Sequence, residues 1–314
     1  MKFLKTYIFF FLVFSYTLIS AQTTGDFRSR QNGNWNDPNS WEYYNGTIWV
    51  NPATTYPGQI ATTANDVVIR NSHSISLGVD LSTSGTINSV TIGDRNGSGL
   101  ASIETLTITN TAGLNTTSFT IAYDGFVTWQ ASVNKSLKFP ANTNIVVEPV
   151  HPDEGVGGVA LHDTHGLHAN TTPCSNSRAL EIGTSKYSSC QGAGSLLTFD
   201  QVNNAGGNLN VSPSFTAPAC INQTLNLFAN PGGSELDDTP INYSWNVIPP
   251  SGANYAITAT ENPTDTPLLL GSYIYEVTIT NNSGITNTNS VTIEVTSCNK
   301  KVITNRRITY RVKK

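Results

Sequence analysis

A succession of very short apolar runs is the feature that most constrains the fold of this chain. The runs in its first half are Val67–Ile69, Ser74–Leu77, Val90–Ile92, Leu106–Ile108, Phe119–Ile121 and Ile145–Val147. Each is rich in β-branched or aromatic residues with a period of two, which indicates a short β-strand. Turn sequences separate them, among them the segment 94–97 and Asp124-Gly125. The sequence therefore predicts an all-β protein built from many short strands.

The composition agrees with this prediction. Only 12% of the residues are charged, and Thr and Asn are abundant in their place. Because Asn, Thr and Gly are poor helix formers, a helical protein is excluded. The 38% share of hydrophobic residues is enough to bury a core, which excludes intrinsic disorder.

Residues 67–206 show a loose repeat. The steps from Val90/Ile92 to Leu106/Ile108 and on to Phe119/Ile121 are sixteen and thirteen residues. Such spacing predicts a short, right-handed β-solenoid, in which each coil buries an apolar stripe against the next. A sandwich or jelly roll remains open as the competing β-architecture. The last strands of this domain are expected at residues 179–183 and 196–199, and the aromatic segment 22–66 is expected to cap it.

Residues 207–298 form a second expected domain. Its predicted strands are Thr224–Phe228, Ile241–Val247, Tyr273–Thr280 and Ser290–Val295, with turn sequences rich in Pro, Gly and Asn between them. Strands at this spacing predict a β-sandwich of about ninety residues.

The four cysteines favour an oxidising compartment. No Cys-x-x-Cys pair occurs, so a zinc ribbon or a thioredoxin-type redox site is not expected. An even count in an exported chain indicates disulfides. Of the three possible connectivities we favour the local one, Cys174–Cys190 and Cys220–Cys298, because each pair then lies within one domain.

The two ends of the chain differ from its body. Residues 1–21 carry Lys2, Lys5 and an apolar run from Tyr7 to Ile19, the pattern of a secretory signal peptide. The mature chain is therefore expected to be secreted or on the cell surface, without a membrane span. Residues 22–299 hold eight Lys and Arg against 21 Asp and Glu, whereas residues 299–314 form a basic tail. An acidic body excludes a nucleic-acid partner, because phosphate contacts require a basic face.

Two segments of the second domain resemble PKD or bacterial immunoglobulin-like domains. They are Tyr243-Ser-Trp245-Asn and the stretch from Gly271 to Gly284, Gly-Ser-Tyr-Ile-Tyr-Glu-Val-Thr-Ile-Thr-Asn-Asn-Ser-Gly. The turn after the tryptophan departs from the usual PKD pattern, because Ile248-Pro-Pro-Ser-Gly252 stands there. The resemblance implies a sandwich fold.

The first half resembles exported β-helical surface proteins of Bacteroidota-type bacteria, and its entry is similar to the G8 domain. The motifs that carry this resemblance are Gly33-Asn-Trp35-Asn-Asp-Pro-Asn-Ser-Trp41 and Asp66-Val-Val-Ile-Arg-Asn-Ser-His-Ser-Ile75. It implies an adhesin-like or structural role.

A histidine cluster is one candidate site. His162, His165 and His168 recur at a spacing of three, in a glycine-containing segment that favours a loop. Imidazole and carboxylate ligands suit Zn, Cu or Ni, and Asp153-Glu154 or Asp237-Asp238 could help to bind Ca, but a polar loop that merely tolerates histidine and solvated acidic turns are the favoured interpretations. No cofactor is therefore expected.

A tryptophan cluster is the second candidate site. Trp35, Trp41 and Trp49 fall within fifteen residues, and aromatic faces stack on sugar rings. The favoured interpretation is that they fill the hydrophobic cap, since large aromatic residues are mostly buried.

Signatures of common enzymes are absent from the sequence. It holds no Gly-x-Ser-x-Gly elbow, His-Glu-x-x-His helix, phosphate-binding loop or dinucleotide fingerprint. The leading expectation is a non-enzymatic surface or extracellular protein that acts in adhesion or scaffolding, with a glycan or a protein as partner. A carbohydrate-binding module and a polysaccharide-active β-helix enzyme remain as alternatives.

Overall fold

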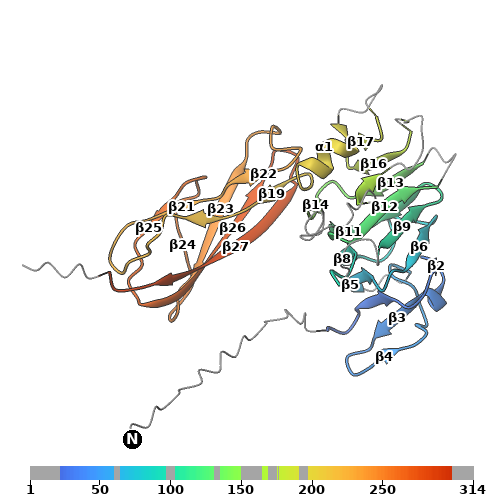
Figure 1. Ribbon diagram of the computed structural model, residues 1–314, viewed down its shortest axis with the longest axis horizontal. Coiled ribbons are helices and arrows are strands. Elements are labelled where there is room, and N and C mark those ends of the chain that lie inside the picture. The colour runs from blue at the N-terminus through green and yellow to red at the C-terminus, as the bar shows by residue number, and fades with distance from the viewer. Residues whose placement is uncertain are drawn as a thin grey trace, which may run out of the picture.

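The computed structural model describes residues 22–59, 64–96, 103–130, 135–149, 165–168, 175, 177–190 and 197–298. The predicted signal peptide and the basic tail lie outside these residues. Within them the chain is all-β, as its sequence predicts, with strands joined by turns and two short helices. Figure 1 shows two domains, and each has its own hydrophobic core.

Three sheets build the first domain. The first sheet has the order β14 (Asn144–Val147), β11 (Thr116–Ile121), β8 (Ile87–Ile92), β5 (Ala64–Ile69), β1 (Phe27–Ser29), β3 (Trp41–Tyr44) and β4 (Trp49–Val50). The second has the order β15 (Gly166–His168), β12 (Gly125–Trp129), β9 (Glu104–Ile108), β6 (Ser74–Leu77) and β2 (Gly33–Asn34). The third has the order β18 (Leu197–Thr198), β17 (Ser185–Ser188), β16 (Ala179–Ile182), β13 (Ser136–Phe139), β10 (Ala112–Leu114) and β7 (Asp80–Leu81).

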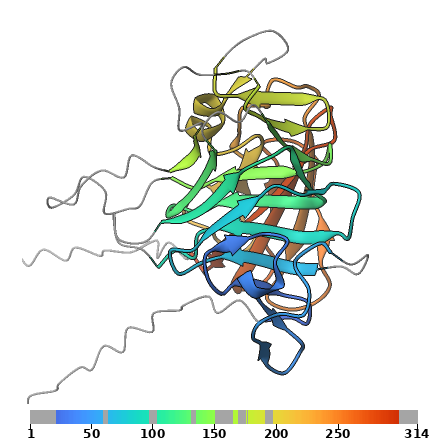
Figure 2. The same cartoon turned by 90° about the vertical axis from the view of Figure 1, so that its right-hand side faces the viewer.

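The chain visits these sheets in turn. From β5 onward, successive strands belong to the first, second and third sheet, and the same circuit repeats through β16. Strands one circuit apart pair in parallel, for example β5 with β8 and β6 with β9. Figure 2 shows the circuits stacked on one another. The steps of sixteen and thirteen residues in the sequence thus connect strands of different sheets. Strands that pair with each other are separated by one full circuit.

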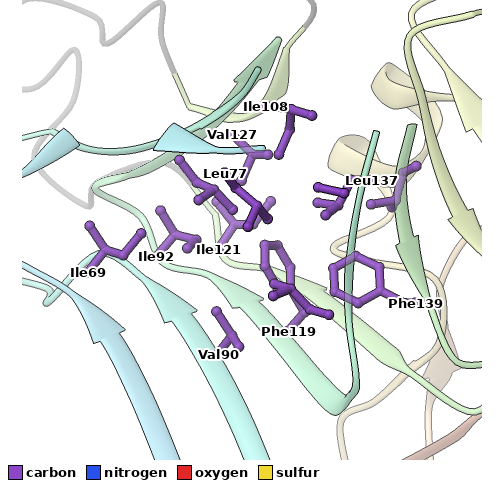
Figure 3. Close-up of a cluster of buried hydrophobic side chains, with 14 of the residues drawn as sticks. Ile69, Leu77, Val90, Ile92, Ile108, Phe119, Ile121, Val127, Leu137 and Phe139 are labelled. Atoms are coloured by element: carbon purple, nitrogen blue, oxygen red, sulfur yellow. The ribbon is translucent and has the colours of Figure 1, made fainter. Parts of the chain in front are cut away.

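The core of the first domain lies between the three sheets. Inward residues of neighbouring circuits stack in rows, such as Ile69, Ile92 and Ile121, because the parallel register places them side by side. All three are fully buried (Figure 3). Burying one such side chain contributes about 1.5–3 kcal/mol, so each added circuit stabilises its neighbour. Trp35 and Trp41 belong to this same core, and β1 pairs with β5, so residues 22–66 continue the domain.

A short helix replaces part of one predicted strand. The expected strand at residues 196–199 is wrong beyond Thr198, because α1 (Phe199–Asn204) begins there. Thr198 accepts a hydrogen bond from the amide of Gln201, and the Gln201 side chain accepts one from the amide of Thr198. This capping box favours a helix. The helix buries Phe199 and Val202 in the core.

Replacing Thr198 by alanine is expected to remove this cap. We expect the free energy of unfolding of the first domain to fall by about 1 kcal/mol, as for other N-cap losses. Urea denaturation followed by tryptophan fluorescence measures the change. Thr47→Ala, at an exposed loop position, is the control; equal stability of the two variants would contradict the role of the cap.

The second domain is a β-sandwich, as predicted. One sheet contains β24 (Tyr255–Ala256), β23 (Asn242–Ile248), β26 (Gly271–Thr280) and β27 (Thr286–Val295). The other contains β20 (Ser214–Phe215), β21 (Leu225–Phe228) and β25 (Thr264–Asp265), and β19 (Asn210–Val211) pairs with β22 (Pro231–Gly232). All of these pairs are antiparallel. Alternate residues of β26, including Tyr275 and Val277, are buried against Trp245 and the facing sheet.

The link between the domains covers an edge of the first sheet. After α1, Gly207 bridges Val146 in antiparallel fashion, and the amide of Asn208 donates to the carbonyl of Ile145. Gly207 has φ of 130°, and a Cβ there would lie 2.0 Å from the Ile145 carbonyl oxygen. Only glycine fits this position.

Candidate functional site

A groove on the outer face of the first sheet is the candidate functional site. Strand alternation turns Val67 and Val90 inward, which leaves Asp66, Val68, Ser89 and Thr91 facing outward. Together with residues of β1 and β4 they surround a space of about 340 Å³. The groove thus crosses three parallel strands and ends at the hairpin of β3 and β4.

Trp49 forms the aromatic end of the groove. It is half-buried, and its ring lies 3.9 Å from the guanidinium carbon of Arg28 and 5.3 Å from the Tyr44 ring. Glu42 accepts a hydrogen bond from Arg28 Nε, and its Oε1 accepts one from Asn51 at 2.9 Å. These contacts hold Arg28 and Trp49 in fixed positions.

Charges of both signs line the groove. Three carboxylates and three guanidinium groups line it, namely Asp26, Asp66, Asp94, Arg28, Arg70 and Arg95. Burial lowers the pKa of Arg70, and the charge of Arg28 lowers it further, while Glu42 at 3.6 Å raises it. Arginine remains protonated under these conditions. Because Arg28 and Arg70 lie beside Glu42 and Arg95 pairs with Glu148, the three aspartates leave the groove mildly acidic, with both donors and acceptors along it.

Arg95 and Glu148 close the opposite end. Arg95 Nε donates to both carboxylate oxygens of Glu148, at 2.8 and 3.1 Å, and this pairing raises the pKa of Arg95. Tyr123 donates its hydroxyl hydrogen to the carbonyl of Arg95. The guanidinium of Arg95 is thus already engaged at this end of the groove.

Three carboxylates meet beside the groove, at the corner where the first sheet passes to the second. One oxygen each from Asp94, Glu104 and Asp124 lies within 4.8 Å of the others. The pKa of Glu104 is raised to about 7, chiefly by burial, with added repulsion from Asp124 and Asp94; the hydrogen bond from the Ser72 amide opposes the rise. We refer to these three residues as the acidic corner. Among the described residues this group alone has the geometry of a metal site.

Two of the three candidate tryptophans lie in the core and not in a binding surface. Trp35 and Trp41 are fully buried and contact each other edge to face, with ring centroids 5.0 Å apart. Their indole N–H groups donate to the carbonyls of Pro57 and Trp35 respectively. They fill the core, as the favoured interpretation has it, and Trp49 alone remains at the surface.

The histidine cluster is partly visible. His162 lies outside the described residues. His165 Nε2 is 2.7 Å from the carbonyl oxygen of Glu148, and His168 is exposed on β15 with its ring 6.0 Å from that of Phe126. The loop expected here is wrong for residues 166–168, which join β12 because Leu167 is buried in the core.

One predicted disulfide is confirmed. Cys220 and Cys298 are bonded across a sequence separation of 78, with their Cα atoms 5.4 Å apart. Cys174 lies outside the described residues, so its pairing with Cys190 stays a prediction.

A second surface lies at the tip of the sandwich. The loop Leu268–Leu270 exposes three leucines, and Leu268 is 69% exposed. Beside it, Tyr255 and Tyr273 line an apolar hollow of about 490 Å³. The hydroxyl groups of Tyr255 and Tyr275 both donate to Asp265 at 2.7 Å, which fixes this end of the sandwich.

Sequence reasoning missed both the groove and the acidic corner. Asp94 and Asp124 appear in the sequence only as turn residues, each two or three positions after a buried isoleucine. That shared position after a strand was the available signal, since equivalent turns of stacked circuits lie side by side.

Comparisons with known proteins give fold likenesses only. No family model matches, and no curated protein matches. Among solved structures, the chain is similar to the PKD1 domain of the metalloprotease PrtV from Vibrio cholerae (18% identity, 28% of this chain, 96% of that one, TM-score 0.23). It is also similar to the PKD1 domain of Vibrio anguillarum Epp (18% identity, 29% of this chain, 95% of that one, TM-score 0.23). A third similar structure is a carbohydrate-binding module of the β-sandwich superfamily (22% identity, 29% of this chain, 35% of that one, TM-score 0.25). With TM-scores this low, these likenesses establish no function. In the part of the chain that the structure describes, no helix is long and apolar enough to span a membrane.

Proposed function

We propose that this protein is a non-enzymatic extracellular binding protein and that the groove beside Trp49 binds neutral saccharides. The observation that carries the proposal is the combination of a fixed aromatic ring with a row of polar side chains on parallel strands. An aromatic face packs against the C–H face of a sugar, while carboxylates and guanidinium groups exchange hydrogen bonds with its hydroxyls.

The charges of the groove weigh against an acidic saccharide. Such a sugar would meet Asp26, Asp66 and Asp94, whereas the three arginines are already paired with Glu42 or Glu148. A neutral sugar avoids this repulsion, and its hydroxyl groups can use both donors and acceptors. Adhesion through bound saccharides would combine the adhesive role expected from the sequence with the alternative of a carbohydrate-binding module.

The buried state of the acidic corner supports binding over catalysis. Glu104 is 0% exposed and Asp124 is 3% exposed, so a substrate in the groove does not reach these carboxyl groups. A glycosidase requires two carboxyl groups that flank the scissile bond. The carboxylates that line the groove itself, Asp26, Asp66 and Asp94, already accept hydrogen bonds from neighbouring groups, so the polysaccharide-active alternative has less support than binding.

We further propose that the first domain is a right-handed β-solenoid with a G8-like entry, and that the second is of the PKD or immunoglobulin-like class. The repeating circuit through three parallel sheets supports the first assignment. The antiparallel strand pairing around Trp245 supports the second. The disulfide supports an extracellular location, since such bonds persist in oxidising compartments.

A glycan array that carries neutral, acidic and amino-sugar glycans tests the proposal. We expect binding to neutral glycans, and the variant Trp49→Ala is expected to bind about tenfold more weakly, equivalent to about 1.4 kcal/mol. Ile48→Ala is the matched control, because Ile48 is exposed next to Trp49 and does not line the groove. An array without neutral hits, or equal affinity of the two variants, would count against the groove.

The sandwich tip suggests a second contact, with a protein partner. Three consecutive exposed leucines are unusual on a free surface and mark interaction sites. If adhesion uses this tip, the double variant Leu268→Ser/Leu270→Ser is expected to lose cell attachment while glycan binding is unchanged. Attachment that persists in this variant would exclude the tip.

A further inference from the structure

The acidic corner is assembled from three separate turns of the chain. Asp94 follows β8, Glu104 opens β9, and Asp124 precedes β12. The amide of Glu104 donates to the carbonyl of Asp124 at 3.1 Å, which ties two of the turns together. The parallel register of β9 and β12, with Glu104 opposite Gly125, keeps the three carboxyl groups together.

Two glycines at the corner make room for Asp124. Gly93 has φ of 107°, and a Cβ on it would lie 2.2 Å from Asp124 Oδ1. A Cβ on Gly125 would lie 2.1 Å from the carbonyl oxygen of Ile92. Both glycines thus allow Asp124 to lie against the backbone of the preceding circuit.

One carboxylate oxygen at the corner is left unsatisfied. Glu104 is fully buried, and its Oε1 accepts a hydrogen bond from the Ser72 amide at 2.6 Å. Its Oε2 is buried as well and has no hydrogen-bond partner among the described residues. A buried oxygen without a partner is costly, and so are three clustered carboxylates. Arg95, which interacts electrostatically with Asp124, is already engaged by Glu148.

We propose that the acidic corner binds a calcium ion through carboxylate oxygens of Asp94, Glu104 and Asp124. Two oxygens that bind one calcium ion at about 2.3–2.6 Å lie at most about 5 Å apart, and the observed limit of 4.8 Å agrees with this. An all-oxygen set suits Ca²⁺ or Mg²⁺ and disfavours zinc, which prefers nitrogen and sulfur. Calcium is favoured over magnesium because Mg²⁺ keeps several waters, and two of these three ligands are buried.

The proposed ion has a consequence for the groove. Asp94 lines the groove and also belongs to the corner. Its Oδ2 accepts hydrogen bonds from the amide of Asn71 at 3.0 Å and from the side chain of Asn96 at 2.7 Å. An ion bound to Asp94 would therefore also hold the turns that contain Asn71 and Asn96, on either side of Asp94 in the groove.

Isothermal titration of the EDTA-treated mature chain with calcium chloride alone tests the site. We expect one ion per chain, with a Kd of about 1 mM or below, as in extracellular modules. Glu104→Gln and Asp94→Asn are each expected to weaken binding at least tenfold. Glu235→Gln is the matched control, because Glu235 is also a buried carboxyl group with a raised pKa, but lies in the sandwich. It is expected to bind calcium as the unaltered chain does.

Thermal unfolding is the second measurement. Calcium is expected to raise the melting temperature of the unaltered chain and of Glu235→Gln, because a ligand stabilises the state that binds it. Asp94→Asn keeps a partly exposed surface position and is expected to fold, so it tests the site even if Glu104→Gln does not fold. No heat and no shift up to about 10 mM calcium would overturn the proposal, and so would tighter binding of magnesium or unchanged binding in Asp94→Asn. Glycan binding is measured separately, so this outcome is independent of the saccharide proposal.

Discussion

Replacing Asn208 by alanine is expected to lower the free energy of unfolding of the first domain by about 3–5 kcal/mol, since each buried polar group left unpaired costs about 1–3 kcal/mol. Asn208 is fully buried at the junction of the domains. Its Oδ1 accepts hydrogen bonds from the amides of Ile145 and Leu209, both at 2.9 Å. Its Nδ2 donates to the carbonyl of Thr143 at 3.1 Å. Alanine would leave all three backbone groups without these partners.

Urea denaturation in a Trp245→Phe background measures this loss, because the remaining four tryptophans all lie in the first domain. Asn226→Ala, at an exposed position of β21, is the matched control and is expected to change stability by less than about 0.5 kcal/mol. A loss below about 1 kcal/mol in Asn208→Ala would show that water replaces the lost hydrogen bonds, contrary to the burial seen here.

Removing the disulfide of the second domain is expected to cost about 4–5 kcal/mol on the loop-entropy model, because the bond closes a loop of 78 residues. The loop contains nearly the whole sandwich. Loss of the disulfide therefore increases the conformational entropy of the unfolded chain more than loss of a bond that closes a short loop would. The double variant Cys220→Ala/Cys298→Ala removes the bond without leaving a thiol at either position.

Trp245 reports on this change, because it is buried in the sandwich core and donates its indole hydrogen to Thr260. Its fluorescence in guanidinium is expected to show an earlier transition in the double variant. Dithiothreitol should shift the transition of the unaltered chain to the same point and leave the double variant unchanged. Coincident transitions in the oxidised chain and the double variant would refute this prediction.

The sequence carries the strands but not their assignment to sheets. Val90 and Leu106 both begin correctly predicted apolar runs, yet they belong to different sheets, since pairing occurs one circuit later. The strand at Gly125–Trp129 escapes an alternation rule because all five of its residues are buried. Phe199 extends an apolar run in sequence, but the capping box at Thr198 turns the chain into a helix there. Tertiary packing thus determines the sheet to which each strand belongs, and one local cap determines where a helix replaces a strand. The hydrophobic period alone indicates neither.

The candidate site was only partly predictable. Trp49 was named, but Trp35 and Trp41 have the same chemistry and lie within the core, and only the fold separates them. Asp94 and Asp124 are 30 positions apart in the sequence, and their approach depends on a parallel register that no local pattern fixes. Glu104 lies outside every motif in the sequence. A site formed between stacked circuits has no fixed sequence spacing, because the number of residues between its members depends on the lengths of the loops. A search for motifs of fixed spacing therefore does not find it.

The segment Gly207–Leu209 has a consequence for self-association. A parallel stack offers an open strand at each end, and an open strand recruits identical strands from other molecules. Here the bridge between Gly207 and Val146 and the hydrogen bond from Asn144 to Leu209 occupy the last strand of the first sheet. At the other end of that sheet the antiparallel hairpin of β3 and β4 breaks the parallel pattern. Growth into a filament is thus blocked at the β14 end, where the segment that leads into the sandwich domain covers the edge. At the other end the terminal strand β4 has only two residues, which leaves a very short edge for pairing.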